Sequence, residues 1–228
     1  MVAGRSTATA GFAVVAYKSD GQLDLHFGGG DGIVTTGFGS CSEAGGISSD
    51  EDFAVARLLS SGTPDTGFSS DGKATVSFSP AFDECLGVAI DSGKIVLGGA
   101  DDVSATRDVA LARLTSGGHL DTSFGAGGKF IVSLSNGFDS ATGVAVDGSG
   151  LIVASAAKDE LGWGRFAVLR FTGNGQLDQS FGNSGITATK INGYAAPNGL
   201  ALGNGTVVLA GETQAGGTTS FAAARYLT

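Results

Sequence analysis

Five copies of one short apolar run punctuate the chain, and they constrain its fold more than any other feature. The last four copies begin at intervals of 56, 57 and 55 residues, whereas the first two begin 41 residues apart. Self-similarity at a period of this size indicates an array of one supersecondary unit. The copies are FAVVAY from Phe12, FAVARL from Phe53, VALARL from Val109, FAVLRF from Phe166 and FAAARY from Phe221.

A turn motif accompanies the first four runs. Each of these runs is followed by a Gly-x-x-Asp turn, and a phenylalanine comes three residues after the aspartate. The aspartates are Asp24, Asp65, Asp121 and Asp178, and the phenylalanines are Phe27, Phe68, Phe124 and Phe181.

The apolar stretches are short and indicate strands. They hold Val, Ile, Phe and Ala, and Gly, Asp, Ser and Asn bound them, which is the strand-and-turn pattern. The chain has 40 glycines but only three prolines, and long helical patterns are absent. We therefore expect an all-β fold, a β-propeller of four-stranded repeats of about 56 residues, with incomplete first and last blades. The expected units of this single domain, 1–228, are 1–38, 39–78, 79–134, 135–191 and 192–228.

Two units can be divided into four strands each. The strands expected in the later unit are 143–146, 151–156, 166–171 and 186–191, and those in the unit before it are 87–90, 94–99, 109–114 and 129–134. Between Phe38 and Phe53 the chain is about one hairpin too short for the same plan, so the blade number and ring closure stay open.

These residues carry a family resemblance. The segment Leu120-Asp-Thr-Ser-Phe-Gly-Ala-Gly-Gly-Lys129, after Val109-Ala-Leu-Ala-Arg-Leu, resembles the delta-60 repeat family, and Gly143-Val-Ala-Val-Asp-Gly-Ser-Gly-Leu-Ile-Val is similar to the NHL-type propeller repeat. The resemblance implies a β-propeller of the kind found in secreted or surface bacterial proteins. It implies no defined catalytic activity and no functional residues.

Two charged residues recur with the repeat. Arginines occupy one position of the third strand, and the aspartate of the turn recurs beside them. A ring of ligands is one interpretation, but a charge inside a packed sheet must be paired, which favours an Arg–Asp anchor for each turn. The turn phenylalanines are then wedges between blades. The arginines are Arg57, Arg113, Arg170 and Arg225.

The chain offers little for catalysis, cofactors or metals. The run Gly125–Gly128 leads into a strand rather than a helix, which excludes a phosphate loop. The aspartate turns lack the carboxylate spacing of calcium loops, and two histidines in turn positions make no metal cluster. Cys41 and Cys85 hold equivalent positions in adjacent units, so both a disulfide and a pair of small buried residues remain open.

Charge and hydropathy restrict the partners. The net charge of −9 argues against nucleic acid and anionic membrane surfaces, and no stretch reaches transmembrane length. No signal-peptide pattern follows Met1. Low lysine content with abundant Gly, Ser, Thr and Asp suits an extracellular or cell-surface protein.

The connections that vary most between units are the expected binding face. They should lie at the end opposite the Leu-Asp-x-x-Phe turns, because antiparallel strands send the two sets of loops to opposite ends. Variable loops on a rigid scaffold are where binding residues concentrate. The candidates are Asp83, Glu84, Asp101, Asp102, Asp108, Asp139, Asp159, Glu160 and Trp163, the only tryptophan.

We expect a non-catalytic binding or scaffold module that recognises an unknown protein or carbohydrate partner. A glycan lyase or hydrolase is the alternative, which requires paired carboxylates such as Asp83 or Glu84 with Asp139. A purely structural segment of a longer repeat protein is a third interpretation.

Overall fold

Antiparallel sheets account for the regular secondary structure, in line with the short β-branched and aromatic runs of the sequence. The computed structural model describes residues 2–6, 11–37, 52–103, 106–147, 152–158, 164–191 and 193–228. Within these ranges it contains no helix, and therefore no helix that could span a membrane. The all-β prediction is confirmed.

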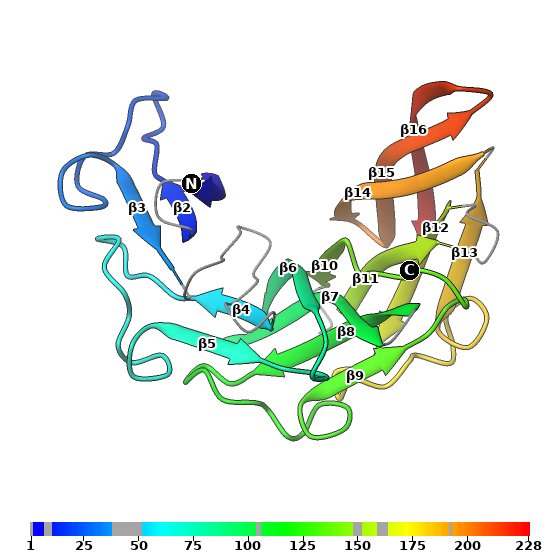
Figure 1. Ribbon diagram of the computed structural model, residues 1–228, viewed down its shortest axis with the longest axis horizontal. Helices are drawn as coiled ribbons and strands as arrows, with labels where there is room; N and C mark the ends of the chain where they lie inside the picture. The colour runs from blue at the N-terminus through cyan, green and yellow to red at the C-terminus, as the bar shows by residue number, and fades with distance from the viewer. Residues whose placement is uncertain are drawn as a thin grey trace. The chain divides into compact units, whose positions relative to one another are not determined.

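The strands form five sheets, which we number as repeats one to five in chain order (Figure 1). Repeat one is β1 (Val2–Ser6), β2 (Gly11–Val15) and β3 (Ile33–Thr36), and repeat two is β4 (Phe53–Ala56) and β5 (Lys73–Val76). Repeat three is β6 (Asp83–Asp91), β7 (Lys94–Val103), β8 (Thr106–Leu114) and β9 (Lys129–Val132). Repeat four is β10 (Gly143–Val146), β11 (Ile152–Lys158), β12 (Gly164–Phe171) and β13 (Ile186–Lys190). Repeat five is β14 (Tyr194–Gly203), β15 (Thr206–Ala215) and β16 (Thr218–Leu227).

Repeats three and four each have four strands in chain order, as the sequence predicts. In both sheets, neighbouring strands follow one another along the chain, as in a four-stranded meander: the orders are β6-β7-β8-β9 and β10-β11-β12-β13. Residues 38–51, where the sequence is about one hairpin too short, lie outside the described residues.

The chain divides into two compact units. The first comprises Met1–Ser77, Asp83–Cys85 and Ser116–His119, and the second comprises Phe78–Phe82, Leu86–Thr115 and Leu120–Thr228. The second unit therefore holds most of repeat three and all of repeats four and five.

The core of the second unit lies between its sheets. One cluster joins repeats three and four, and a second joins repeats four and five. The sheet of repeat four lies between the two clusters, so both of its faces are covered and its strand β12 shows no clean polar alternation. The first cluster is Val96, Val109, Leu111, Phe124, Ala141, Val144, Leu169 and Phe171, and the second is Phe166, Val168, Phe181, Ala195, Val207, Leu209, Ala222 and Tyr226.

The central hairpins are longer than predicted. The register of β7 and β8 continues through Asp101↔Asp108 and Asp102↔Arg107 to Val103↔Thr106. The prediction that Asp101, Asp102 and Asp108 lie in loops is therefore wrong. The sequence shows a polar stretch there, but an antiparallel ladder needs only backbone hydrogen bonds and tolerates polar side chains near its end.

Candidate functional site

The recurring arginine, aspartate and phenylalanine form the same anchor in three repeats. The arginine Nε donates to the aspartate Oδ2 at 2.8 Å in repeat two, 2.8 Å in repeat three and 2.9 Å in repeat four. The guanidinium lies over the ring of the turn phenylalanine, 4.8, 4.8 and 4.9 Å from its centre. The predicted structural pair is confirmed. The sets are Arg57–Asp65–Phe68, Arg113–Asp121–Phe124 and Arg170–Asp178–Phe181.

Each aspartate also organises its own turn. Asp121 accepts a hydrogen bond from the Ser123 hydroxyl at 2.7 Å, and Asp178 accepts one from Ser180 at 2.7 Å. In repeat one, His26 takes the serine position, and its backbone N–H and Nδ1 lie 3.1 and 3.2 Å from Asp24 Oδ1. His26 is thus a turn residue, as its position predicts.

Hydrogen bonds hold the pKa of each of these turn aspartates below its usual range. For Asp24 the main cause is the backbone N–H of His26, and for Asp178 it is the Ser180 hydroxyl. For Asp121 the main cause is the Lys94 ammonium, and Ser123 and the Arg113 guanidinium act in the same direction. These carboxylates therefore stay ionised inside their turns.

The anchor in repeat three is the most buried. The Arg113 side chain is 4% exposed and the Asp121 side chain 10%. Lys94 Nζ lies 2.7 Å from Asp121 Oδ2, and Asp91 Oδ2 lies 3.6 Å from Arg113 Nη1. Two cations and two carboxylates thus compensate each other within the second unit.

The anchors also link consecutive repeats. Arg57 Nη1 donates to the Ser116 carbonyl, and Arg113 Nη1 donates to the Gly173 carbonyl of the next turn along the chain. Backbone bonds join the same two pairs of turns, Ser69 N–H to Gly117 O and Gly125 N–H to Asn174 O, each at 2.9 Å. The turns of repeats one and two, where Ala16 takes the arginine position, are joined by the bond from Gly28 N–H to Ser61 O, also at 2.9 Å. We call this repeated arrangement the turn contact.

The described acids of the predicted binding face do not share one environment. Asp102 and Arg107, which face each other across β7 and β8, form an ion pair with Nε and Oδ1 2.6 Å apart. The Arg107 guanidinium lies over the Phe82 ring, 5.6 Å from its centre. These contacts stiffen the end of the hairpin.

Asp139 belongs to the connection between β9 and β10 and is fully buried. Its Oδ2 accepts hydrogen bonds from the N–H groups of Leu134 and Ser135, each at 2.7 Å, and its Oδ1 accepts one from the Ser135 hydroxyl at 3.0 Å. The carboxylate therefore holds the loop together. Asp83 is also fully buried, at the start of β6, and Glu84 beside it is partly exposed.

Asp101 and Asp108 form the least compensated pair of carboxylates. They stand directly opposite each other on β7 and β8, so both side chains lie on one face of the sheet. Asp101 is 1% exposed, Asp108 is partly exposed, and the Oδ1 atom of each is buried and accepts no hydrogen bond from the described residues. Such oxygens are unusual, because nearly all buried polar groups in native proteins are hydrogen-bonded.

The remaining candidates, Asp159, Glu160 and Trp163, lie outside the described residues, as does Cys41. Cys85 is buried on β6. The question of a Cys41–Cys85 disulfide therefore stays open. The described residues contain no group of three or more His, Cys, Asp or Glu side chains suited to a metal ion.

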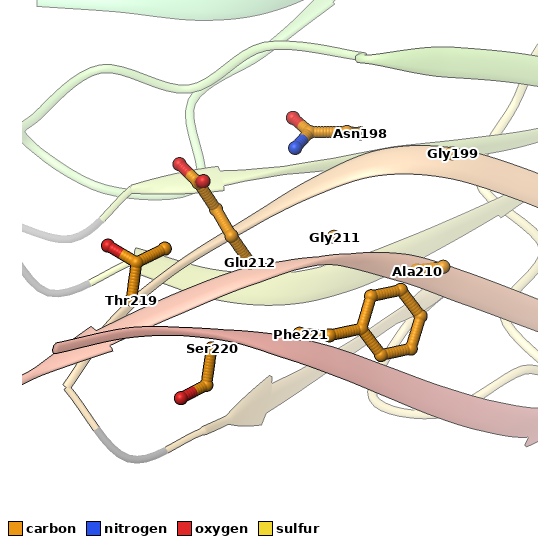
Figure 2. Close-up of a pocket in the computed structure, with 8 residues that line it drawn as sticks. All are labelled: Asn198, Gly199, Ala210, Gly211, Glu212, Thr219, Ser220 and Phe221. Carbon is orange, nitrogen blue, oxygen red and sulfur yellow. The ribbon is translucent and has the colours of Figure 1, made fainter.

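Two cavities lie on repeats four and five. One, of about 490 Å³, runs over β14, β15 and β16 and is bordered by Phe221 and Glu212, which face each other on β16 and β15 (Figure 2). The other, of about 330 Å³, lies beside Arg170, Phe181 and Gly182 and is bordered by Thr228.

Sequence reasoning missed two parts of the anchors. Lys94 begins β7, far in the chain from the turn it supports, and no repeated pattern marks it. Backbone carbonyls accept the hydrogen bonds from Arg57 and Arg113, and the amino-acid sequence does not indicate which carbonyls do so. The near-constant spacing of the later turns, 56 and 57 residues, was the available signal, since successive repeats of one plan bring equivalent turns side by side.

A family model described as "Domain of unknown function (DUF5122) beta-propeller" matches the chain at residues 43–68, 91–124 and 150–181. The three matches together cover less than half of the chain. Each ends on a turn phenylalanine, Phe68, Phe124 or Phe181, so the family pattern includes the anchors described above. The similarity supports a family of β-propeller repeats, while the narrower resemblance to delta-60 and NHL-type repeats stays a prediction. No curated protein matches the chain significantly.

Proposed function

We propose that the chain is a non-catalytic binding or scaffold module built from β-propeller repeats. It recognises a protein or glycan partner through the hairpin ends and connections opposite the Leu-Asp-x-x-Phe turns, and it acts outside the cytoplasm. The repeated anchors support this role, because they fix identical turns in successive repeats and leave the other end of each sheet to vary.

The observation that carries the proposal is the Asp101–Asp108 pair. Asp108 is partly exposed and stands opposite Asp101, and the Oδ1 atom of each carboxylate accepts no hydrogen bond from the described residues, so an ammonium group or a sugar hydroxyl that reaches this pair would supply a missing donor. The net charge of −9 attracts cationic partners over a longer range.

Hydrolysis of glycans receives less support from the same residues. That chemistry needs two accessible carboxylates at a set separation. Asp139 is fully buried and its two oxygens are bound to Leu134 and Ser135, while Asp83 is fully buried as well.

The test is a binding screen of the full chain against a glycan array and a panel of lysine-rich peptides. We expect Asp108→Asn to lower the affinity for the tightest-binding probe about tenfold, which corresponds to about 1.4 kcal/mol of binding free energy. Binding of a cationic probe should also weaken as salt rises, because salt screens exposed charges.

Asp20→Asn is the matched control, since it removes one charge from a turn and keeps the oxygen that accepts from the Gln22 N–H. Trp163→Ala tests the tryptophan that the sequence marks as a candidate. A probe whose affinity is the same in wild type, Asp108→Asn and Trp163→Ala would place the binding site elsewhere.

A further inference from the structure

Repeat one keeps the turn of the anchor but lacks its arginine. Ala16 stands at the position that Arg57 takes in repeat two. The Ala16 N–H donates to the Gly32 carbonyl at 3.0 Å, and the Ala16 carbonyl accepts from the Asp24 N–H at 2.9 Å. The corresponding two backbone bonds of Arg57 are 2.8 and 2.9 Å long. The backbone is therefore paired in the same way at both positions, and only the side chain differs.

The turn aspartate of repeat one has one carboxylate oxygen without a donor. Asp24 Oδ1 lies 3.1 Å from the backbone nitrogen of His26 and 3.2 Å from its Nδ1. Asp24 Oδ2 takes the place of the atom that binds the arginine Nε in the other three anchors, and it accepts no hydrogen bond from the described residues. The Asp24 side chain is 38% exposed, against 25%, 10% and 16% for the aspartates that hold an arginine. Solvent therefore reaches this carboxylate.

The second acceptor of the anchor is also present beside repeat one. In repeat two, Arg57 Nη1 donates to the Ser116 carbonyl of the next turn. Ser60 holds the equivalent place, because it directly precedes Ser61, whose carbonyl accepts the turn-contact bond from Gly28. Ser60 is exposed, and its carbonyl accepts no hydrogen bond from the described residues.

We propose that Asp24 Oδ2 and the Ser60 carbonyl bind the guanidinium group of an arginine side chain from a partner protein. We call Asp24 and Ser60 the arginine site. In repeat two the guanidinium of Arg57 binds the two equivalent acceptors at once. A planar guanidinium spans such a pair with donors in fixed directions, whereas an ammonium is a point charge. The Arg57 side chain is 33% exposed, so this position of the turn lies at the surface.

The arginine site should bind an isolated arginine side chain weakly. Phe27 is 3% exposed, so a guanidinium from outside does not gain the stacking that Arg57 has on Phe68. Two contacts to exposed acceptors correspond to an affinity on the order of millimolar.

The arginine site is separate from the proposed binding face. Asp24 and Ser60 both belong to the first compact unit, and the site uses neither Asp101 nor Asp108. The two proposals can therefore be tested independently.

NMR titration of the full chain with N-acetyl-arginine amide tests the proposal over about 1–50 mM, at constant ionic strength so that screening does not change. The backbone amide signals of His26 and Gly28 should shift and approach saturation. The dissociation constant for N-acetyl-lysine amide should be about fivefold higher, because an ammonium does not span both acceptors.

Two variants locate the binding. Asp24→Asn should raise the dissociation constant for the arginine probe about fivefold, because it removes the charge of the acceptor. Ala16→Arg should abolish the shifts, because its own guanidinium occupies the arginine site, and should raise the melting temperature by about 2–4 °C. Asp20→Asn is the matched control in the same turn and should bind as wild type does.

Three results would overturn the proposal. They are an absence of shifts up to about 50 mM of the arginine probe, equal affinity for the lysine probe, and wild-type affinity in Asp24→Asn. A folded Ala16→Arg that binds the probe as wild type does would overturn it as well. If Ala16→Arg loses its circular dichroism spectrum, Asp24→Asn decides the question.

Discussion

At the scale of single residues, the anchor arginine makes three contacts that lysine could not combine. In repeat three, Nε binds Asp121, Nη1 binds the Gly173 carbonyl of the next turn, and the flat guanidinium covers the Phe124 ring. A planar guanidinium offers fixed donors and a stacking face, whereas an ammonium is a point charge. Arg57 in repeat two makes the same three kinds of contact, and Arg170 in repeat four makes the contacts with the aspartate and the ring.

Replacing Arg113 should therefore be costly. We predict that Arg113→Ala lowers the free energy of unfolding by about 3–5 kcal/mol, because it leaves Asp121 and Asp91 buried with less compensation. Arg57→Ala should cost less, since the Arg57 side chain is 33% exposed and water replaces part of its contacts. Urea denaturation of the two variants measures this difference. A loss below about 1 kcal/mol for Arg113→Ala would mean that the pair behaves as a surface pair.

The lowered pKa of Asp121 predicts a pH dependence. A carboxyl group whose pKa is lower in the folded state adds stability that is complete above its unfolded pKa of about 3.9 and is lost as the pH falls through the folded value. We therefore expect stability to decline as the pH falls from about 5 to 2, and Asp121→Asn to show a smaller decline. Thermal unfolding of both proteins across this range is the measurement. Equal slopes for the two proteins would assign the decline to other groups.

At the scale of elements, the turn contact depends on glycine for two separate reasons. Gly175 has a positive φ, and it also lies against Phe124 and Gly125 of the preceding repeat. Gly21 shares only the first property. Comparing Gly21 with Gly175 therefore separates the effect of backbone conformation from the effect of close packing against the preceding repeat.

Alanine at these two positions should give different results. Gly21→Ala should cost about 1 kcal/mol, the price of a left-handed conformation for a residue with a Cβ. Gly175→Ala should cost at least about 2 kcal/mol more, because overpacking adds to that conformational cost. Differential scanning calorimetry of both variants compares them. Similar losses would show that the turn adapts to the extra methyl group.

The apolar strand cores were predictable from sequence, but the hairpin ends were not. The strand at 143–146 matches β10, because Gly143 and the turn after Val146 bound it clearly. Predicted strands at 94–99 and 109–114 became β7 and β8, which extend to Val103 and back to Thr106. Backbone hydrogen bonding between the strands determines where they end, and the pattern of apolar residues does not indicate those ends.

The candidate site was predictable only as a set of residue types. The sequence indicated acids in the variable segments, and the structure separates them by environment. Asp139 closes a loop and Asp102 pairs with Arg107, while Asp101 and Asp108 face each other. Those distinctions depend on strand register and on backbone donors, neither of which a spacing pattern specifies.

At the scale of the whole molecule, the central strands of repeats three and four bury large apolar side chains, whereas strands β3 and β16 each keep one exposed. Repeats three and four contribute Val96, Leu111 and Leu169, each 0% exposed. Ile33 on β3 and Phe221 on β16 are 39% and 79% exposed. In repeat arrays, stability comes from each repeat and from its junctions with its neighbours.

We therefore predict graded hydrogen exchange. Backbone amides of β7, β8 and β12 should exchange most slowly, and those of β3 and β16 should exchange fastest, because opening the end sheets exposes less new apolar surface. Mass spectrometry of peptides after exchange at low micromolar protein concentration gives the comparison. Uniform protection across all five sheets would contradict this gradient.

The turn contact has an evolutionary consequence. Each contact joins the end of one turn to the start of the turn in the next repeat, as Gly125 and Asn174 illustrate. Duplication or deletion of one whole repeat recreates a valid neighbour on both sides, whereas a change of half a repeat leaves an arginine without its carbonyl. Genes encoding such arrays should therefore vary in length by complete repeats, so that the number of repeats can change while the pairing rule between them stays constant.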